Sequence, residues 1–156
     1  MKNKKGLTLV EILIVLTILS VLIIAAVSGM DPIGTMAKAR DTQRKKDLNR
    51  IKIAFEDYFN DRNCYPSQGL VDMLTDVSRC KSDVFSPWLG NWPCNPGDTP
   101  YSIVIGDDEN CPKWYKVMTF LENKSDPQIS DQGGIGDGVG IPLNYGVASE
   151  NISLTQ

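Results

Sequence analysis

Apolar residues are distributed very unevenly along this 156-residue chain. The segment from Leu7 to Val27 is almost wholly apolar, whereas the chain beyond Gly29 is polar or mixed. As a helix, the apolar segment would rise about 32 Å, which matches the hydrocarbon core of a bilayer. Three lysines and no acidic residue come before it. We therefore expect one membrane-spanning helix, with the N-terminus in the cytoplasm by the positive-inside rule and the rest of the chain outside.

A second helix is predicted after the span. Gly29, Pro32 and Gly34 interrupt the helical pattern, because proline removes a backbone hydrogen bond and glycine weakens a helix. We interpret them either as a membrane-exit linker or as a break at which the helix can bend. The helix is then expected to resume from Met36 to Arg62.

One apolar stripe runs along this second helix. Its members follow the helical spacing i, i+3, i+7, i+10 and are Leu48, Ile51, Phe55 and Tyr58. We expect the stripe to seat the helix on the C-terminal domain. The charged residues expected on the opposite face are Arg40, Asp41, Arg44, Lys45, Asp47, Glu56 and Asp57. They indicate either a solvated face or a surface for contacts between subunits.

The rest of the chain predicts a small antiparallel sheet. Residues 67–100 are rich in turn-forming residues, with a short helical turn at 70–74. The expected strands, rich in β-branched and aromatic residues, are 101–105, 114–121 and 143–148. Two tryptophans, Trp88 and Trp92, either cover a small core or form an exposed patch for adhesion to a carbohydrate or another surface. The expected fold class is α+β, with a long N-terminal helix packed on about three strands.

All four cysteines lie beyond the apolar segment, at Cys64, Cys80, Cys94 and Cys111. An even number of cysteines outside the membrane favours two disulfides. The absence of CxxC pairs and of histidine disfavours a zinc site. The sequence leaves the connectivity open, and the pairs Cys64–Cys80 and Cys94–Cys111 are favoured because each closes a local loop.

Charge and missing motifs restrict the chemistry of the chain. Residues 64–156 contain five Lys/Arg and twelve Asp/Glu, a net charge of −7. This acidity argues against general nucleic-acid binding, since attraction to phosphates needs the opposite charge. The chain has no histidine and no GxSxG, P-loop or GxGxxG motif. We therefore expect no enzyme activity.

A loop rich in glycine and aspartate follows the second predicted strand. Asp126, Asp131 and Asp137 could supply oxygen ligands to Ca²⁺ from this loop. The alternative is a solvated loop without a metal. No other cofactor is expected.

A single acidic residue inside the apolar segment, Glu11, distinguishes three interpretations of the N-terminus. The segment is a signal peptide cleaved near Ser28, an anchor that is kept whole, or a helix that is kept after cleavage behind Gly6. A carboxylate in an apolar span costs about 2.5–3.5 kcal/mol on insertion scales. Cleavage after Gly6 would give Leu7 a free α-amino group, one helical turn from Glu11. That amine could pair with Glu11 of the same or a neighbouring subunit, so only the third interpretation gives Glu11 a role.

The order Lys5-Gly6, then Leu7-Thr-Leu-Val-Glu11, then a long apolar stretch resembles the class III leader of type IV pilins and type II secretion pseudopilins. The resemblance implies cleavage after Gly6 by a prepilin peptidase and N-methylation of Leu7, a position where the family most often has phenylalanine. A long helix that ends at a Tyr-Pro turn, here Tyr65-Pro66, extends the resemblance over about the first 67 residues. The Gly/Asp loop also resembles the calcium loop of major pseudopilins.

The resemblance implies a domain organisation and a set of partners. The expected parts are a leader at 1–6, a membrane-spanning and polymerisation helix at 7–28, an amphipathic half-helix at 29–63 and a globular β domain at 64–156. The implied partners are other copies of the chain, the prepilin peptidase, an inner-membrane assembly platform with its ATPase, and membrane lipid. Nucleic acid would be a partner only in a DNA-uptake role.

The function expected from this resemblance is that of a structural subunit. Its filament would be a type IV pilus at the cell surface or a secretion pseudopilus in the periplasm. One alternative is a minor tip subunit that binds a surface or DNA, using Trp88 and Trp92 or the Lys/Arg cluster at 44–46. Another alternative is a monomeric ectodomain held by a single span.

Overall fold

The computed structural model describes residues 8–29, 31–97, 99–106, 108–129 and 143–154. The chain divides into two compact units, residues 1–36 and 37–156. In these described ranges the elements follow one another in the order α1, α2, α3, a short 3₁₀ helix η1, and strands β1, β2 and β3. The α+β fold class expected from the sequence, with a long apolar N-terminal helix and three antiparallel strands, is confirmed.

Helix α1 spans Leu9–Ser28 and helix α2 spans Pro32–Arg62. Helix α2 therefore begins earlier than the predicted Met36. The reason is local: proline is well suited to the first helical position, and the side chain of Asp31 accepts a hydrogen bond of 2.9 Å from the backbone N–H of Gly34. Pro32 and Gly34, expected to interrupt the helix, are thus part of its first turn.

The C-terminal end of α2 is set by Asn63. Asn63 adopts a left-handed backbone conformation with φ of 55°, which asparagine tolerates better than most residues. Its N–H donates to the carbonyl of Phe59 at 2.7 Å, and its own carbonyl accepts from Nζ of Lys113 at 2.7 Å. The helix therefore ends next to the predicted Tyr65-Pro66 turn.

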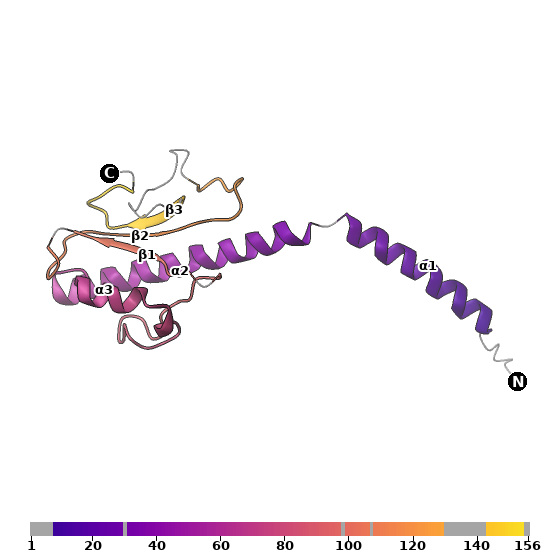
Figure 1. Cartoon of the computed structure of the whole chain (residues 1–156), viewed down its shortest axis with the longest axis horizontal. Coiled ribbons are helices and arrows are strands. Elements are labelled where there is room, and N and C mark those ends of the chain that lie inside the picture. Colours follow the sequence, from indigo (N-terminus) through magenta and orange to yellow (C-terminus); the bar gives the residue numbers. More distant parts are fainter. Residues whose placement is uncertain (1–7, 30, 98, 107, 130–142, 155–156) are drawn as a thin grey trace, which may run out of the picture. The chain divides into compact units, whose positions relative to one another are not determined.

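The sheet is an antiparallel meander in the order β1-β2-β3. Its strands are β1 at Ser102–Ile105, β2 at Tyr115–Thr119 and β3 at Tyr145–Ala148, each shorter than the predicted segment. Figure 1 shows the sheet lying along one side of α2. The central strand β2 is buried over its whole length. It has a strand on each edge, Tyr115 and Val117 pack in the same cluster as residues of α2, and Met118 packs in a second cluster with Leu143.

The core lies between α2 and the sheet. Leu48, Ile51 and Phe55 are fully buried, which confirms the predicted apolar stripe. The ring of Phe55 packs edge-on against Tyr115 of β2, with 4.9 Å between ring centroids, and against Phe85 at 5.4 Å. Burying such side chains contributes about 1.5–3 kcal/mol each, so this stripe is the main attachment of α2.

The turn-rich region contains more helix than its pattern predicted. Helix α3 spans Gln68–Thr75 and η1 spans Val77–Arg79, around the helical turn expected at 70–74. Val71 and Leu74 of α3 are buried.

The two disulfides are Cys64–Cys111 and Cys80–Cys94, so the favoured pairing of Cys64 with Cys80 and of Cys94 with Cys111 is wrong. Hydrogen bonding explains the difference. The N–H of Tyr65 donates to the carbonyl of Pro112 at 2.9 Å, which brings the β1–β2 connection to the end of α2. The Cα atoms of Cys64 and Cys111 are then 4.9 Å apart, well within disulfide reach, despite a sequence separation of 47.

The two disulfides close loops of different length, so they are expected to contribute unequally to the free energy of unfolding. Loop-closure entropy gives about 4 kcal/mol for a separation of 47 and about 3 kcal/mol for the separation of 14 between Cys80 and Cys94. We expect the double change of Cys64 and Cys111 to serine to lower the free energy of unfolding more than the same change of Cys80 and Cys94. Denaturant unfolding of the detergent-solubilised chain measures both. A larger loss from the second pair would contradict the entropic account.

Candidate functional site

The predicted processing residues, Gly6 and Leu7, lie outside the described residues. The described chain begins at Thr8, whose side chain caps α1 by accepting a hydrogen bond of 3.2 Å from the N–H of Glu11. Thr8 and Glu11 have the spacing of a capping box, in which a threonine or serine is followed three residues later by glutamate. Our sequence reasoning missed Thr8, although this spacing was visible in it.

Glu11 occupies the first turn of α1. The exposed N–H groups of a helix N-terminus carry a partial positive charge, which stabilises a nearby carboxylate. The cap and the helix dipole therefore lower the cost of keeping Glu11 at the edge of an apolar helix. The helix dipole amounts to only part of a positive charge, so it does not fully compensate the negative charge of the Glu11 carboxylate. The carboxylate can therefore still bind a cation.

The surface of α1 is apolar on all sides. The helix has 20 residues, an 18-residue stretch of it has a mean hydropathy of 3.0, and none of its residues is buried. Its few hydroxyl groups are satisfied inside the helix: those of Thr17 and Ser28, for example, each donate to a backbone carbonyl at 2.8 Å. A helix of this length and composition can cross a membrane, and can equally pack against other apolar helices.

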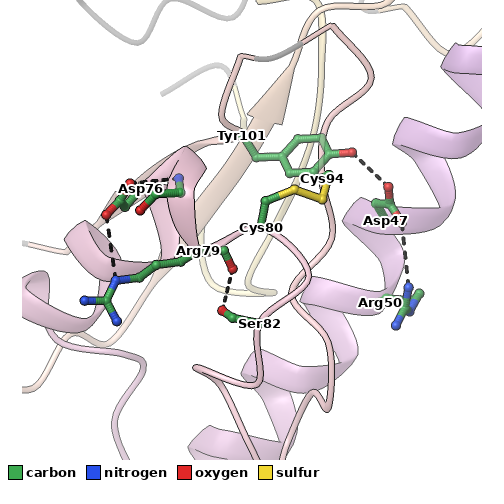
Figure 2. Close-up of a disulfide and its surroundings, with 9 residues drawn as sticks. Asp47, Arg50, Asp76, Arg79, Cys80, Ser82, Cys94 and Tyr101 are labelled. Atoms are coloured by element: carbon green, nitrogen blue, oxygen red, sulfur yellow. Dashed lines mark hydrogen bonds and ion pairs between the residues drawn. A yellow bond between two sulfur atoms is a disulfide. The ribbon is translucent and has the colours of Figure 1, made fainter.

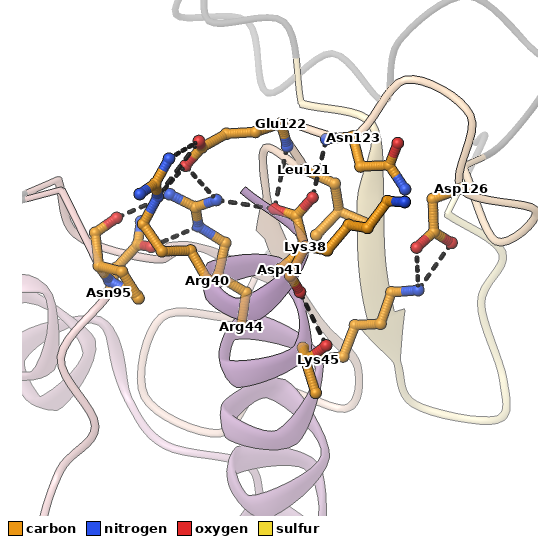
Figure 3. Close-up of polar contacts among 12 residues, drawn as sticks. Lys38, Arg40, Asp41, Arg44, Lys45, Asn95, Leu121, Glu122, Asn123 and Asp126 are labelled. Atoms are coloured by element: carbon orange, nitrogen blue, oxygen red, sulfur yellow. Dashed lines mark hydrogen bonds and ion pairs between the residues drawn. The ribbon is translucent and has the colours of Figure 1, made fainter. Parts of the chain in front are cut away.

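A buried carboxylate, Asp41, connects α2 to the loop that follows β2. Its two oxygens accept hydrogen bonds from the backbone N–H groups of Glu122 and Asn123, at 2.9 and 2.8 Å (Figure 3). Asp41 also pairs with the guanidinium of Arg44 at 2.8 Å. Because Asp41 and Arg44 are only 2% and 6% exposed, this ion pair is protected from solvent.

Arg44 and Arg40 extend this cluster across the surface of α2. Arg44 pairs with Glu122 at 2.8 Å and donates to the side chain of Asn95 and the carbonyl of Pro96. Arg40 forms a bidentate contact with the same Glu122. Hydrogen bonds from the two guanidinium groups, first that of Arg40, lower the pKa of Glu122 to about 2. We call Arg40, Asp41, Arg44 and Glu122 the Asp41 network.

The burial of Asp41 and Arg44 shows that they were predicted on the wrong face of α2. Asp41 and Arg44 were expected opposite the apolar stripe, but they precede Leu48 by seven and four positions, which is the helical spacing of the stripe itself. Asp47 is also buried, at 6% exposure. Of the charged residues predicted for the outer face, Asp57 is exposed.

Asp47 lies next to the Cys80–Cys94 disulfide. Its carboxylate accepts a hydrogen bond of 3.0 Å from the hydroxyl of Tyr101, and Figure 2 shows that hydroxyl directed at α2. Burial raises the pKa of the Asp47 carboxyl, against the opposing effect of the Tyr101 hydrogen bond and of Arg50. The contact joins the start of β1 to α2, and is structural.

Of the three proposed calcium ligands, Asp126 is described, whereas Asp131 and Asp137 lie outside the described residues. The carboxylate of Asp126 accepts two hydrogen bonds from Nζ of Lys45, at 2.7 and 2.6 Å. The ammonium of Lys45 lowers the pKa of this carboxyl. Within the described part of the chain, no group of three or more His, Cys, Asp or Glu side chains could hold a metal ion. A calcium site in this loop stays a prediction.

The two tryptophans cover the core, as the first of their two interpretations expected. Trp92 is 4% exposed and stacks near Phe55. Trp88 packs edge-on against Tyr58 at 4.6 Å, Arg62 lies 5.7 Å over its ring, and its Nε1 donates to Asp61. Because its ring is already in contact with a tyrosine and an arginine, Trp88 offers little surface for stacking a sugar.

Comparison with known proteins identifies the N-terminal segment. Residues 1–27 match the family described as the prokaryotic N-terminal methylation motif. This motif is the class III prepilin leader of type IV pilins and pseudopilins, so the expected resemblance is confirmed for this segment. No curated protein and no solved structure matches the chain.

The burial of Asp41 predicts a large loss of stability on its removal. Asp41→Ala leaves the buried guanidinium of Arg44 without its nearest partner and two backbone N–H groups without an acceptor, which we expect to cost about 3–5 kcal/mol. The matched control is Asp57→Ala, an exposed aspartate of the same helix, which should change stability by no more than about 0.5 kcal/mol. Denaturant unfolding compares the two variants, and similar values would refute the structural role of the network.

Proposed function

We propose that this chain, whose first 27 residues carry the N-terminal methylation motif of type IV pilins and pseudopilins, is a structural subunit of a type IV pilus-like or pseudopilus filament. The observation that carries the proposal is the combination of that motif with an uncovered apolar helix that is capped by Thr8 and carries Glu11 in its first turn. Each copy offers an apolar surface that needs either lipid or other copies to cover it.

Processing prepares the helix for association. A prepilin peptidase cuts after Gly6, and the new α-amino group of Leu7 is methylated. Until assembly the chain is a single-pass membrane protein, with its N-terminus in the cytoplasm and residues 37–156 outside. Two disulfides in that unit support an oxidising compartment. The assembly platform and its ATPase then move the subunit from lipid into the filament.

Glu11 has two roles in this proposal. Its N–H takes part in the cap with Thr8, and its carboxylate pairs with the α-amino group of Leu7, its own or that of a neighbouring copy. The first role belongs to the folded helix, while the second exists only after cleavage. Pairing with a full positive charge compensates for the burial of the carboxylate among apolar helices far better than the helix dipole alone.

A structural role is favoured over catalysis and over adhesion. Proteins with this leader are structural subunits, and the chain has no histidine to act as a general base. Adhesion through Trp88 and Trp92 would need rings that are open to a ligand, and both rings pack into the aromatic core.

The mature N-terminus tests the proposal directly. Mass spectrometry of the chain isolated from its native membrane should find a polypeptide that starts at Leu7 and carries a methyl group on its α-nitrogen. An intact Met1, or a start at Gly29, would show that the segment is an anchor or a signal peptide, and would refute the proposal.

Two variants at the start of α1 distinguish the pairing of Glu11 with the Leu7 amine from the capping of the helix by Thr8. Glu11→Gln keeps the capping-box spacing but removes the negative charge, so cleavage should continue. The α-amino group of Leu7 then has no partner in the packed helices, and because an uncompensated buried charge costs about 2.5–3.5 kcal/mol, we expect filament yield to fall at least about tenfold. The control Thr8→Ala removes the cap, worth about 0.5–2 kcal/mol, and keeps the charge. Sheared filaments and the processed subunit are quantified by immunoblot. Normal filaments from Glu11→Gln, or an equal loss from both variants, would contradict the pairing role.

A further inference from the structure

The outward face of α2 carries a stripe of exposed side chains. In chain order this outward stripe consists of Ala39, Thr42, Lys46, Asn49, Arg50, Ile53, Asp57, Asn60 and Asp61. Its spacing follows the helical period, about half a turn away from the buried stripe that contains Leu48 and Phe55. Ile53, in the middle of the stripe, is 63% exposed.

Several charges of α2 are neutralised by ion pairs within the chain, whereas those of the outward stripe are unpaired or only distantly paired in the described residues. Arg40, Arg44 and Lys45 pair with acidic groups of the loop after β2. By contrast, Lys46 and Asp57 form no ion pair with any residue of the described chain. Of the other stripe charges, Arg50 lies a long 3.8 Å from Asp47, and Asp61 accepts only the neutral indole N–H of Trp88.

The charges are ordered along the stripe. Lys46 and Arg50 are basic, Ile53 in the middle is apolar, and Asp57 and Asp61 are acidic. Asp57 follows Lys46 by eleven positions and Asp61 follows Arg50 by eleven positions. Eleven residues are close to three helical turns, or about 16.5 Å, so each acid lies on the same side of the helix as its basic counterpart.

We propose that the outward stripe is a contact surface between two parallel copies of this chain, in a register shifted by eleven residues. In that register Asp57 of one copy faces Lys46 of the next, and Asp61 faces Arg50. Ile53 then lies opposite Thr42, where a shallow groove runs along the basic half of the stripe. The parallel orientation rests on the proposed function, because subunits inserted in one membrane point the same way.

Charge complementarity selects a second copy as the occupant. An anionic lipid surface or a nucleic acid would be attracted by Lys46 and Arg50, but repelled by the two aspartates along the same stripe. A partner that matches both halves must itself carry an acidic and a basic segment at the same separation along its length. Another copy of α2 meets this requirement without any further assumption.

Engineered disulfides test the register. All four native cysteines are paired, so Lys46→Cys with Asp57→Cys adds the only free thiols. Within one chain these positions are about 16.5 Å apart, beyond the Cα separation of about 4.4–6.8 Å that a disulfide allows. Mild oxidation of intact cells should therefore give a ladder of covalent multimers on non-reducing gels, which neither single variant gives.

The comparison variant pairs Arg50→Cys with Asp57→Cys, which tests a register of seven residues. A ladder from this variant in place of the first would overturn the proposed register. Covalent dimers without higher multimers from the first variant would indicate an antiparallel pair, and would overturn the parallel contact.

Charge reversal tests the same contact without a covalent bond. Lys46→Glu and Asp57→Lys should each lower filament yield roughly fivefold, and the double variant should restore it. Lys124→Glu, at an exposed lysine outside the stripe, is the matched control and should leave the yield unchanged. If the filament yield lost in Lys46→Glu is not restored by adding Asp57→Lys, the stripe has another occupant and the proposal is overturned. The proposed function would still stand as long as the wild-type chain forms filaments. A processed wild-type chain that forms no filaments would refute the proposed function itself.

Discussion

The buried carboxylate of Asp41 sets how α2 meets the rest of the C-terminal unit. A buried charge is tolerated only where several donors compensate it, and Asp41 finds them in Arg44 and in the backbone N–H groups of Glu122 and Asn123. These donors occur together only when the loop after β2 lies across the N-terminal half of α2. The apolar stripe around Leu48 brings α2 to the sheet, and Asp41 then restricts its rotation about its own axis.

The fixed orientation of α2 about its axis separates two kinds of surface. One face of α2 is used within the chain, by the core stripe and the Asp41 network. The opposite face, with Lys46, Ile53 and Asp57, is left without partners in the described chain. Helix α1 has no buried residue at all. The interactions that fold the chain and the surfaces available for association therefore involve different residues.

Part of this structure could be predicted because it depends on local patterns. The strands and the stripe at Leu48, Ile51 and Phe55 follow from periodicity and residue type, and were confirmed. Asp41 and Arg44 were placed on the wrong face because charged residues were assumed to be outside, although their spacing from Leu48 placed them on the buried stripe. For Cys64–Cys111 no local signal existed, since the pairing depends on the hydrogen bond between Tyr65 and Pro112.

The sequence by itself determined the apolar helix, the position of Glu11 within it and the methylation motif, because transfer into lipid and recognition of a leader act on a short, continuous segment. Only the tertiary structure decided which cysteines pair, which groups compensate the charge of Asp41, and which charges of α2 remain without partners in the described chain. Each of these depends on segments far apart in the chain meeting in space, and the free energy of such contacts is not encoded in any one segment.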